Sequence, residues 1–434
     1  MDLMDEILKR LESLHPKIID LKLDRVKRLL QKLGNPERSL PPIIHVAGTN
    51  GKGSTIAMIK AGLQSNGLRT HAYTSPHLVH FSERIEIANE RISEDTLTDV
   101  LTECENVNNS EPITLFEITT CAAFLAFSRK AADYTLLEVG LGGEFDATNV
   151  IENPVVSIIT PISFDHKEYL GDTIKKIAMA KAGIIKKNIP TVISNQSATV
   201  KKILEARCKA NSSDIIWSDK SFSVHFSKKF IIQKKVNKRI EFPFPSLTGT
   251  HQISNAMTAI STLNYLKIPD HNICEGLKST YWPARLQKIE KGNLFEFIKT
   301  YNINNQLWLD GGHNEAASIQ LTESLSLLNT KNLHIIYGSL RNKDHVSFLK
   351  NLANISSSLC LVEIENQPST LMKKVGLADA KEVGWDEVYA AVDIRDAMKH
   401  ICDKNIGSGE HISILICGSL YLAGQALKEN GLSI

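Results

Sequence analysis

The glycine-rich segment Gly48–Ser54, which reads GTNGKGS, contains the residues whose types and spacing point most directly to chemistry. It follows the short apolar run Ile43–Ala47 and precedes Ser54–Asn66, where apolar residues recur at helical spacing. In such a strand–turn–helix, backbone N–H groups and the helix N-terminus bind phosphate, and the lysine adds a positive charge. The segment therefore predicts a nucleotide phosphate site in which the Ser54 hydroxyl coordinates Mg²⁺, although its spacing differs from that of the usual P-loop. The residues expected to contact the nucleotide here are Gly48, Thr49, Asn50, Gly51, Lys52, Gly53 and Ser54.

Two polar residues near the ends of other apolar runs are candidates for binding a metal ion. Glu138 lies at the end of an apolar run and precedes a glycine-rich turn, which is where ligands of open α/β sheets bind. A carboxylate in that position is costly unless a cation or hydrogen-bond donors face it, and this favours a functional role. His166 follows the run Val155–Thr160 by a short loop. On the residues alone, both a structural and a metal-binding histidine remain open.

Lys181 shares the apolar side of a predicted helix, for which Asp172 is a plausible N-cap and Gly183 a plausible end. A buried ammonium must reach water or a partner, so a lysine that extends to solvent is one interpretation. Burial also lowers the pKa of a lysine, and a neutral amine can add CO₂ to form a carbamate, which is the other interpretation. The residues that share this face of the helix are Ile174, Ile177, Ala178 and Lys181.

These residues are positioned by alternating strands and helices, which predict a parallel sheet covered by helices on both faces. The segment Lys220–Phe244 interrupts the alternation and predicts a β-hairpin or meander, after which a helix is expected from His251 to Leu266. Near Tyr281 a second α/β alternation begins, so we expect one domain over residues 1–281 and another over residues 282–434. The expected strands are Ile43–Ala47, Leu136–Val139, Val155–Thr160 and Thr191–Ser194, then Leu307–Asp310, Leu333–Tyr337, Ser358–Ile364 and Ile412–Cys417.

The composition of the 434-residue chain argues against several classes of protein. Fifty lysines and arginines against 48 acidic residues give a net charge of +2, so we expect neither a nucleic-acid nor a membrane partner. No apolar run approaches the roughly 18 residues of a membrane span. The N-terminal residues have the spacing of an amphipathic helix rather than of a signal peptide, and the seven cysteines contain no CxxC pair. We therefore expect a cytoplasmic protein without a disulfide scaffold or a zinc site.

The phosphate-loop sequence resembles that of the ATP-dependent amide ligases of the Mur family, and within them the folylpolyglutamate and dihydrofolate synthases. Further segments resemble motifs of this family and follow in the family's order along most of the chain. They are Tyr73–Leu78 (YTSPHL), Leu137–Gly143 (LEVGLGG), Asp146–Asn149 (DATN), Asp165–His166 with Tyr169–Gly171, Lys181–Ile184 (KAGI), His251–Ala256 (HQISNA), Pro283–Arg285 (PAR) and Asp310–Asn314 (DGGHN). An ordered series of this kind is highly specific.

The resemblance implies a Mur-ligase-like P-loop ATPase domain with a mostly parallel central sheet, followed by a smaller Rossmann-like α/β domain. It also implies that the γ-phosphate of ATP passes to a substrate carboxylate, after which the amine of L-glutamate attacks the acyl phosphate and forms an amide. The expected cofactor is Mg²⁺ at two sites, and Mn²⁺ is a possible substitute because one ligand is an imidazole. The metal ligands implied by the resemblance are Ser54, Ser75, Glu138 and His166.

The resemblance further assigns residues to the nucleotide and to glutamate. Asn255, Arg285 and Asp310 match positions that contact ATP, and His313 and Ser419 match positions on the glutamate side of the site. The lysine that matches Lys181 is carbamylated in relatives, so a carbamate on Lys181 is expected to support the second metal ion. The residues expected to act in catalysis are Lys52, Lys181 and His313.

Several segments resemble the stretches that contact dihydropteroate in bacterial members with both activities. They are Leu14–Pro16 with Asp20–Val26, Thr114–Glu117 and Phe145–Ala147. On the residues alone, Phe116 is equally well explained as a core aromatic. Three positions depart from the family's pattern, because Lys22 and Ala284 stand where glycine is usual and Glu144 stands where arginine is common. The expected substrate contacts are Asp24, Arg25, Thr114, Leu115, Phe116, Glu117, Phe145, Asp146 and Ala147, together with His313 and Ser419.

The sequence therefore predicts a member with both the dihydrofolate synthase and the folylpolyglutamate synthase activities, whose substrates are ATP, L-glutamate, dihydropteroate and folates. A synthase with the folylpolyglutamate activity alone would carry the same motifs. Another Mur-type amino-acid ligase is a further alternative. One of the peptidoglycan type would need a separate N-terminal domain for the uridine nucleotide, for which the 42 residues before Ile43 leave little room. A nucleotide-binding regulatory module would keep the phosphate loop without turnover. The expected oligomeric state is a monomer.

Overall fold

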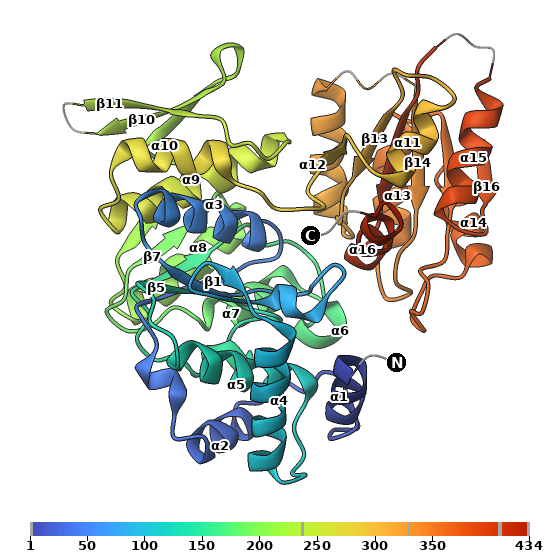
Figure 1. Ribbon diagram of the computed structural model, residues 1–434. Coiled ribbons are helices and arrows are strands. Elements are labelled where there is room, and N and C mark those ends of the chain that lie inside the picture. Colours follow the sequence, from blue (N-terminus) through green and yellow to red (C-terminus); the bar gives the residue numbers. More distant parts are fainter. Residues whose placement is uncertain (1–2, 236–237, 329, 331, 407–409, 432–434) are drawn as a thin grey trace. The chain divides into compact units, whose positions relative to one another are not determined.

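The computed structural model describes residues 3–235, 238–328, 330, 332–406 and 410–431. The chain divides into two compact α/β units (Figure 1). The first comprises Met1–Ser246 and Ile253–Thr280, and the second comprises Leu247–Gln252 and Tyr281–Ile434. No helix among the described residues has the length and the apolar character that a membrane span requires.

The first unit is built on an eight-stranded sheet. Its strands are β1 (Ile43–Ala47), β2 (Thr70–Tyr73), β3 (Ile85–Ile87), β4 (Glu90–Arg91), β5 (Tyr134–Glu138), β6 (Val156–Ile159), β7 (Thr191–Ile193) and β8 (Ile215–Trp217). They lie in the order β4-β3-β2-β5-β1-β6-β7-β8, parallel from β2 to β8, with β3 and β4 as an antiparallel edge. Every residue of the inner strand β1 is buried. The carboxyl ends of β2, β5, β1 and β6 therefore meet at one edge of the sheet, where ligands of such sheets bind.

Helices cover both faces of this sheet, as the alternation in the sequence predicts (Figure 1). The apolar sides of α1, α2, α4 and α5 share one core with residues of β2 and β5, whereas α3 packs against α10. The helices are α1 (Leu3–Glu12), α2 (Asp24–Lys32), α3 (Lys52–Ser65), α4 (Glu94–Asn108), α5 (Leu115–Ser128), α6 (Lys167–Leu170), α7 (Ile174–Ala182), α8 (Ala198–Ala210), α9 (Thr250–Tyr265) and α10 (Asp270–Ser279), with the 3₁₀ helices η1 (Pro36–Ser39), η2 (Phe81–Arg84), η3 (Ala147–Val150) and η4 (Phe226–Lys228).

A separate three-stranded antiparallel sheet confirms the meander expected between residues 220 and 244, of which residues 236 and 237 lie outside the described part of the chain. Its strands are β9 (Phe222–His225), β10 (Phe230–Lys235) and β11 (Lys238–Pro243), in the order β11-β10-β9. The Asn264 side chain of α9 donates a hydrogen bond of 3.0 Å to the Gln233 side chain of β10. This contact fixes the small sheet against the helix.

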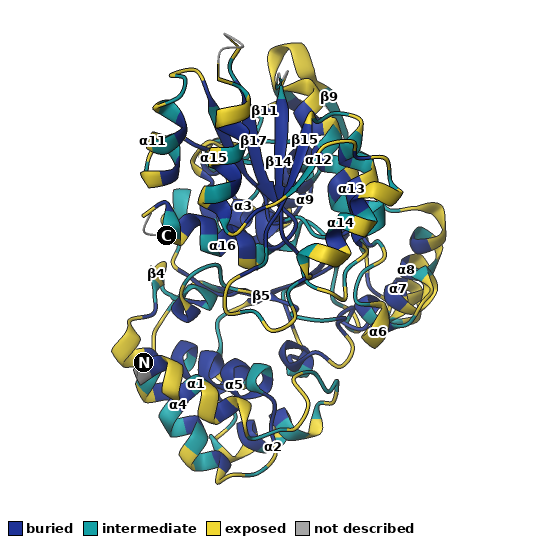
Figure 2. Ribbon diagram, turned by 90° about the vertical axis from the view of Figure 1, so that its right-hand side faces the viewer, coloured by how far each residue is buried: buried dark blue, intermediate teal, exposed yellow. Residues whose placement is uncertain are grey.

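The second unit contains a six-stranded sheet in the order β12-β13-β17-β14-β15-β16, parallel except for β12. Figure 2 shows β14, β15 and β17 as buried strands between helices whose outer sides are exposed. Adjacent strands β13 and β17 pair Leu309 with Ile416, so the loops that follow them start side by side. The elements are β12 (Gln287–Ile289), β13 (Gln306–Leu309), β14 (Leu333–Tyr337), β15 (Ser358–Leu361), β16 (Val388–Ala390) and β17 (Ser413–Cys417), with α11 (Asn293–Lys299), α12 (Glu315–Leu327), α13 (His345–Ala353), α14 (Lys373–Glu382), α15 (Ile394–Lys404) and α16 (Leu420–Glu429).

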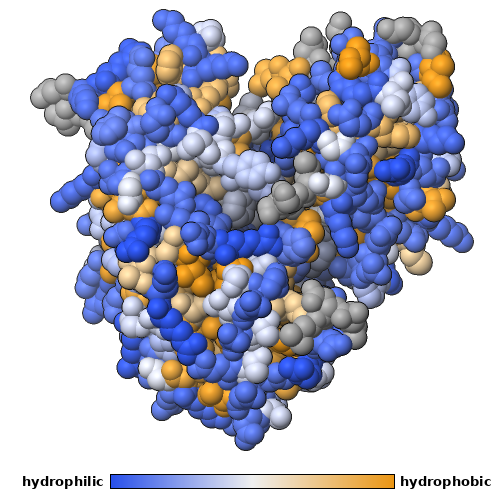
Figure 3. Space-filling view, viewed as in Figure 1, coloured by the Kyte–Doolittle hydropathy of each residue, from blue (hydrophilic) through white to orange (hydrophobic). Residues whose placement is uncertain are grey.

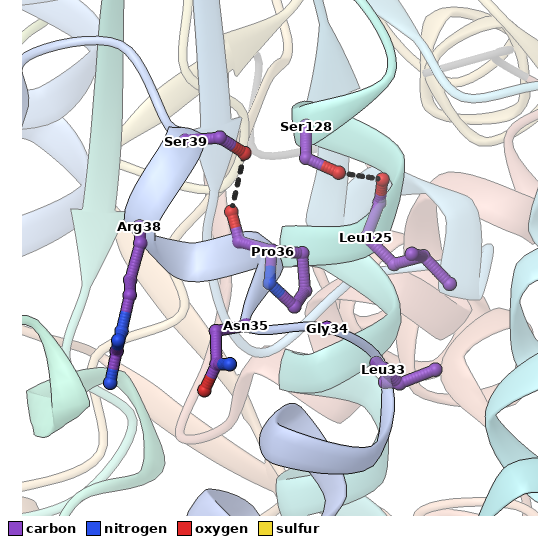
Figure 4. Close-up of a pocket in the computed structure, with 8 residues that line it drawn as sticks. All are labelled: Leu33, Gly34, Asn35, Pro36, Arg38, Ser39, Leu125 and Ser128. Atoms are coloured by element: carbon purple, nitrogen blue, oxygen red, sulfur yellow. Dashed lines mark hydrogen bonds between the residues drawn. The ribbon is translucent and has the colours of Figure 1, made fainter.

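A cavity of about 490 Å³ lies between η1 and the C-terminal end of α5 (Figure 4). Two of the hydroxyl groups that line it, those of Ser39 and Ser128, donate to backbone carbonyls of their own turns. Because η1 precedes β1 and α5 precedes β5, the cavity lies at the amino ends of these strands. It is therefore on the opposite edge of the sheet from the phosphate loop.

Candidate active site

The phosphate loop connects β1 to α3, and two of its glycines are required by close contacts. Gly48, with φ of +154°, leaves no room for a Cβ beside the Thr160 side chain, and Gly51, with φ of +85°, leaves none beside the Asn255 amide. Gly51 is also the N-cap of α3. Asn255 of α9 therefore lies against the loop, which brings together two of the residues predicted to bind the nucleotide.

Lys52 and Glu138 face each other at the carboxyl edge of the sheet. The Lys52 ammonium lies 3.8 Å from a Glu138 carboxylate oxygen and donates to the Thr49 carbonyl at 3.2 Å. The other carboxylate oxygen of Glu138 accepts from the backbone N–H of Ser75 at 3.2 Å. Glu138 is 4% exposed and Ser54 is buried in the first turn of α3. A buried carboxylate at this edge of the sheet is the kind of hard oxygen ligand that Mg²⁺ uses together with substrate phosphates.

Oxygen donors fit Mg²⁺ here, although protein side chains alone do not enclose an ion. Among the described residues, no group of three or more histidine, cysteine, aspartate and glutamate side chains gathers as in a closed metal centre. The candidate ligands Ser54, Ser75 and Glu138 are instead hard oxygen donors, which suit a Mg²⁺ ion that keeps waters and phosphate oxygens as ligands. His166 follows β6 with φ of +51°, and its backbone N–H donates to Asp165 at 2.9 Å.

Lys181 is buried and contacts the phosphate loop. Its ammonium donates to the Gly48 carbonyl at 2.8 Å, so it has a backbone partner instead of extending to solvent. Burial, and to a smaller extent the charge of Lys52, lowers the pKa of Lys181 to about 7, against the opposite effect of Asp165 and Asp146. The expected Asp172 cap of its helix is wrong, because Thr173 is the N-cap and accepts from the Lys176 N–H.

Asp146 closes the glycine-rich turn that follows β5. Its two oxygens accept from the backbone N–H of Leu141 at 2.8 Å and from the Thr148 N–H and hydroxyl at 3.0 and 2.6 Å. His45 of β1 lies behind this group, with Nε2 at 2.9 Å from the Thr148 hydroxyl oxygen. Burial raises the pKa of Asp146. Ala147 is buried beside it, whereas Phe145 is 51% exposed and thus open to a substrate.

The other predicted substrate residues gather around the start of α5. Thr114 and Glu117 form a capping box, in which the Glu117 carboxylate accepts from the Thr114 N–H at 2.8 Å. Arg25 donates to both Glu117 oxygens at 2.9 Å and to Asp20 at 2.8 Å, so its guanidinium is engaged by protein carboxylates. Asp20 was not among the predicted site residues, although a carboxylate five positions before Arg25 is a visible signal. Leu115 and Phe116 are partly exposed, and Asp24 is exposed at the start of α2.

In the second unit, Asp310 organises the linker and the loop after β13. Its oxygens accept from the backbone N–H groups of Leu286 and Gly312, both at 2.7 Å. The Arg285 guanidinium donates to the Ala284 carbonyl at 3.0 Å. His251 was not among the predicted site residues, but it is close enough to Asp310 and Arg285 to feel both charges. Burial lowers the pKa of His251, Arg285 also lowers it, and Asp310 raises it. The HQISNA motif contained the signal for this residue.

The two predicted glutamate-side residues lie on neighbouring loops of the second unit. His313 Nδ1 is 3.1 Å from the Gly311 carbonyl, and Ser419 caps α16 by accepting from the Tyr421 N–H at 3.1 Å. A Cβ on Gly311 would collide with the Leu420 side chain, so the loop after β13 contacts the first residue of α16, which follows Ser419. Within this unit, the structure thus brings the His313 and Ser419 loops together.

Comparison with known proteins identifies the Mur ligase middle domain over residues 46–263. The dihydrofolate synthase/folylpolyglutamate synthase of Bacillus subtilis (strain 168) is 31% identical over 434 residues, which cover 94% of each chain. The chain belongs to this family of Mur-type ligases. The fold class expected from the sequence is confirmed, and family membership identifies the protein as an ATP-dependent acid–amino-acid ligase.

Solved structures of the family match the whole chain. The folylpolyglutamate synthase of Mycobacterium tuberculosis complexed with ADP and AMPPCP has a TM-score of 0.85 at 29% identity and covers 100% of both chains. The bifunctional folylpolyglutamate synthase/dihydrofolate synthase of Yersinia pestis complexed with AMPPNP and Mn ion has a TM-score of 0.84 at 25% identity. It covers 100% of this chain and 99% of that one.

Proposed function

We propose that this protein joins L-glutamate to dihydropteroate and to folates or their polyglutamates, using ATP and a divalent metal ion. The observation that carries the proposal is the meeting of Lys52, Glu138 and Ser75 beside the phosphate loop. The bound nucleotides and Mn ion in the family structures support ATP and a divalent metal as partners of this group. The full-length similarity to a dihydrofolate synthase/folylpolyglutamate synthase supports the substrates.

The reaction divides into two steps. In the first, an oxygen of the substrate carboxylate attacks the γ-phosphorus of ATP, and the bond to the bridging oxygen breaks to give an acyl phosphate and ADP. In the second, the neutral amine of glutamate attacks the acyl carbon, phosphate leaves, and the amine loses a proton as the amide forms. Lys52 stabilises charge on the phosphate oxygens, and we assign the nucleotide contacts of the second unit to Arg285 and Asp310. Asn255 binds the nucleotide beside Gly51.

We assign Mg²⁺ to two sites, with Ser54, Ser75, Glu138 and His166 as protein ligands. When bound, the metal ions neutralise the phosphate oxygens of ATP and orient them for transfer. We also propose that Lys181 carries a carbamate that supports the second ion. Its buried amine, with a pKa of about 7, is neutral often enough at physiological pH to react with CO₂.

The remaining assignments concern substrates and cellular context. Residues 1–281 hold ATP and the pteroate moiety, which meets the partly exposed residues Phe116 and Phe145. Residues 282–434 hold L-glutamate, for which His313 and Ser419 supply polar contacts from adjacent loops. We further propose that the protein acts as a monomer in the cytoplasm.

Release of inorganic phosphate tests this function directly. We expect phosphate only when ATP, Mg²⁺, L-glutamate and either dihydropteroate or a reduced folate are all present. Equal release without the pteroate substrate or without glutamate would contradict the proposal and would favour a nucleotide-hydrolysing regulatory module. Turnover with the folate but not with dihydropteroate would restrict the protein to folylpolyglutamate synthesis. Mass spectrometry of the product would show the added glutamate.

A further inference from the structure

The turn after β5 contains Gly140, Gly142 and Gly143, and these positions require glycine for different physical reasons. Gly142 has φ of +69°, a conformation that other residues rarely adopt. A Cβ on Gly143 would lie 2.8 Å from the Ala180 carbonyl, so this glycine allows the backbone of α7 to approach. Gly140 has neither property, because its φ is not positive and the three atoms nearest to an added Cβ all belong to one side chain. That side chain is the ring of Phe116.

The end of the Phe116 ring points at the position that a Cβ on Gly140 would occupy. The distances from this position are 2.5 Å to Cζ and 2.9 Å to Cε1 and to Cε2. Contacts this short do not occur, so the bare backbone of Gly140 is what allows the ring its present position. The Tyr73 ring lies on another side, with its centroid 5.9 Å from that of Phe116.

The backbone on both sides of the contact between Gly140 and Phe116 is held in place, so the ring is the part that can move. The turn is fixed by the bonds of Asp146 and by the contact of Gly143 with α7. The backbone of Phe116 is fixed in the first turn of α5 by the capping box and by the Arg25–Glu117 pair. A methyl group at position 140 would therefore displace the ring rather than the turn.

We propose that Gly140 is a specificity-determining positioning residue, which sets where the Phe116 ring meets the aromatic part of the pteroate substrate. This inference rests on the proposed function, in which Phe116 contacts that substrate. The glycine itself acts only through the ring. Its effect should therefore appear in the binding of the pteroate substrate and not in that of ATP or glutamate.

The test is a double-mutant cycle of Gly140→Ala and Phe116→Leu in the full-length enzyme. Gly140→Ala should raise the KM for dihydropteroate about tenfold, because a misplaced apolar contact costs that much discrimination. The KM values for ATP and glutamate should stay within about twofold. Leucine lacks the ring atoms that the methyl group would strike. In the Phe116→Leu background, the added alanine should therefore change the KM for dihydropteroate by less than about twofold.

Gly143→Ala is the matched control, because its new methyl group would strike the backbone of α7 and not the ring. Its defect should be the same with phenylalanine or leucine at position 116. An undiminished effect of Gly140→Ala in the leucine background, or an unchanged KM for dihydropteroate in Gly140→Ala, would overturn the inference.

Folding of the variants adds a second measurement. If Gly140→Ala unfolds, the double variant should regain the melting temperature of Phe116→Leu alone, and failure to regain it would also overturn the inference. Failure of the proposed function is a separate outcome. It would appear as wild-type enzyme that releases no phosphate with dihydropteroate, before any variant is compared.

Discussion

Replacing Lys181 with alanine should abolish turnover without unfolding the protein. The loss of the hydrogen bond to Gly48 costs about 1–3 kcal/mol, because it leaves a buried carbonyl without this donor. Removing the buried amine stabilises the folded state, because its charged form is costly to bury. Its pKa is about 7 in the folded protein and 10.5 ordinarily, so below pH 7 its protonation costs the folded state about 5 kcal/mol.

The direction in which the stability changes with pH follows from proton binding. Between pH 7 and 10.5 the unfolded chain binds more protons at Lys181 than the folded protein does, so wild-type stability rises with pH in this window. At pH 6 the unmodified wild type bears the full cost, and Lys181→Ala should melt no lower than the wild type. At pH 10 most of the cost is gone, and the variant should melt lower. Thermal unfolding at the two pH values measures this crossover.

Turnover tests the carbamate itself. The loss in Lys181→Ala should reach about 10³-fold, the scale expected when charge stabilisation at a transferring phosphoryl group is removed. Acetate should restore part of it by placing a carboxylate in the space left by the side chain. Lys181→Met is the matched control, because its side chain fills that space, and acetate should not rescue it.

Dependence on CO₂ is the complementary assay. With a pKa of about 7, roughly a tenth of the Lys181 amine is neutral at pH 6 and roughly nine-tenths at pH 8. Enzyme depleted of CO₂ should lose activity, and bicarbonate should restore it faster at pH 8 than at pH 6. If depletion leaves activity untouched and Lys181→Met remains active, the carbamate proposal is wrong.

Lys52→Ala should lose turnover even at saturating ATP while the fold survives, and near-normal kcat would contradict the phosphate-loop assignment. Because Glu138 is buried, the loss of the cation 3.8 Å away should also lower the free energy of unfolding. Arg285→Ala should raise the activation free energy of turnover by about 3 kcal/mol with the fold intact, and an unchanged kcat would contradict the assignment of Arg285 to the nucleotide. Ala284→Gly should raise the free energy of unfolding by about 0.5 kcal/mol, because the alanine has φ of +56°, which glycine adopts with less strain. A free energy of unfolding in urea below that of the wild type would refute this reasoning. Burial lowers the pKa of His45 to about 3, so below pH 6.5 the unfolded chain binds a proton at this residue while the folded protein does not. The free energy of unfolding of the wild type should therefore fall by about 2 kcal/mol between pH 6.5 and pH 5. His45→Gln should remove this loss.

The parts of the fold that could be predicted from the sequence are those encoded locally. The boundaries of β1 and β14 agree with the predicted runs because each is a short, fully buried strand of a parallel sheet and is apolar except for one histidine. The strands that the pattern did not predict have only two to four residues each, which is too short for an apolar run to be recognised. They are β2, β3, β4, β8, β12 and β16. The meeting of Lys52 with Glu138 follows from topology, because Glu138 ends β5 and Lys52 comes after the adjacent parallel strand β1.

The details that sequence could not supply depend on contacts between distant segments. Arg25 and Glu117 are 92 residues apart, and no local pattern shows that their charges neutralise each other before any substrate binds. The partner of Lys181 is a backbone carbonyl 133 residues away. The segment Leu247–Gln252, which includes the first turn of α9, packs with the second unit, although the helical pattern runs through it without a break.

The turn after β5 explains how one short motif serves two chemical tasks. Its first glycine contacts Phe116 on the side of the proposed pteroate site, and Gly143 contacts the backbone of α7 beside Lys181. Glu138 lies two residues before Gly140, so the backbone of this segment positions the candidate metal ligand and also contacts Phe116 and Lys181. Substitutions at the two glycines should therefore separate these tasks. A methyl group at position 140 should affect substrate binding, whereas one at position 143 should displace Lys181 and affect kcat.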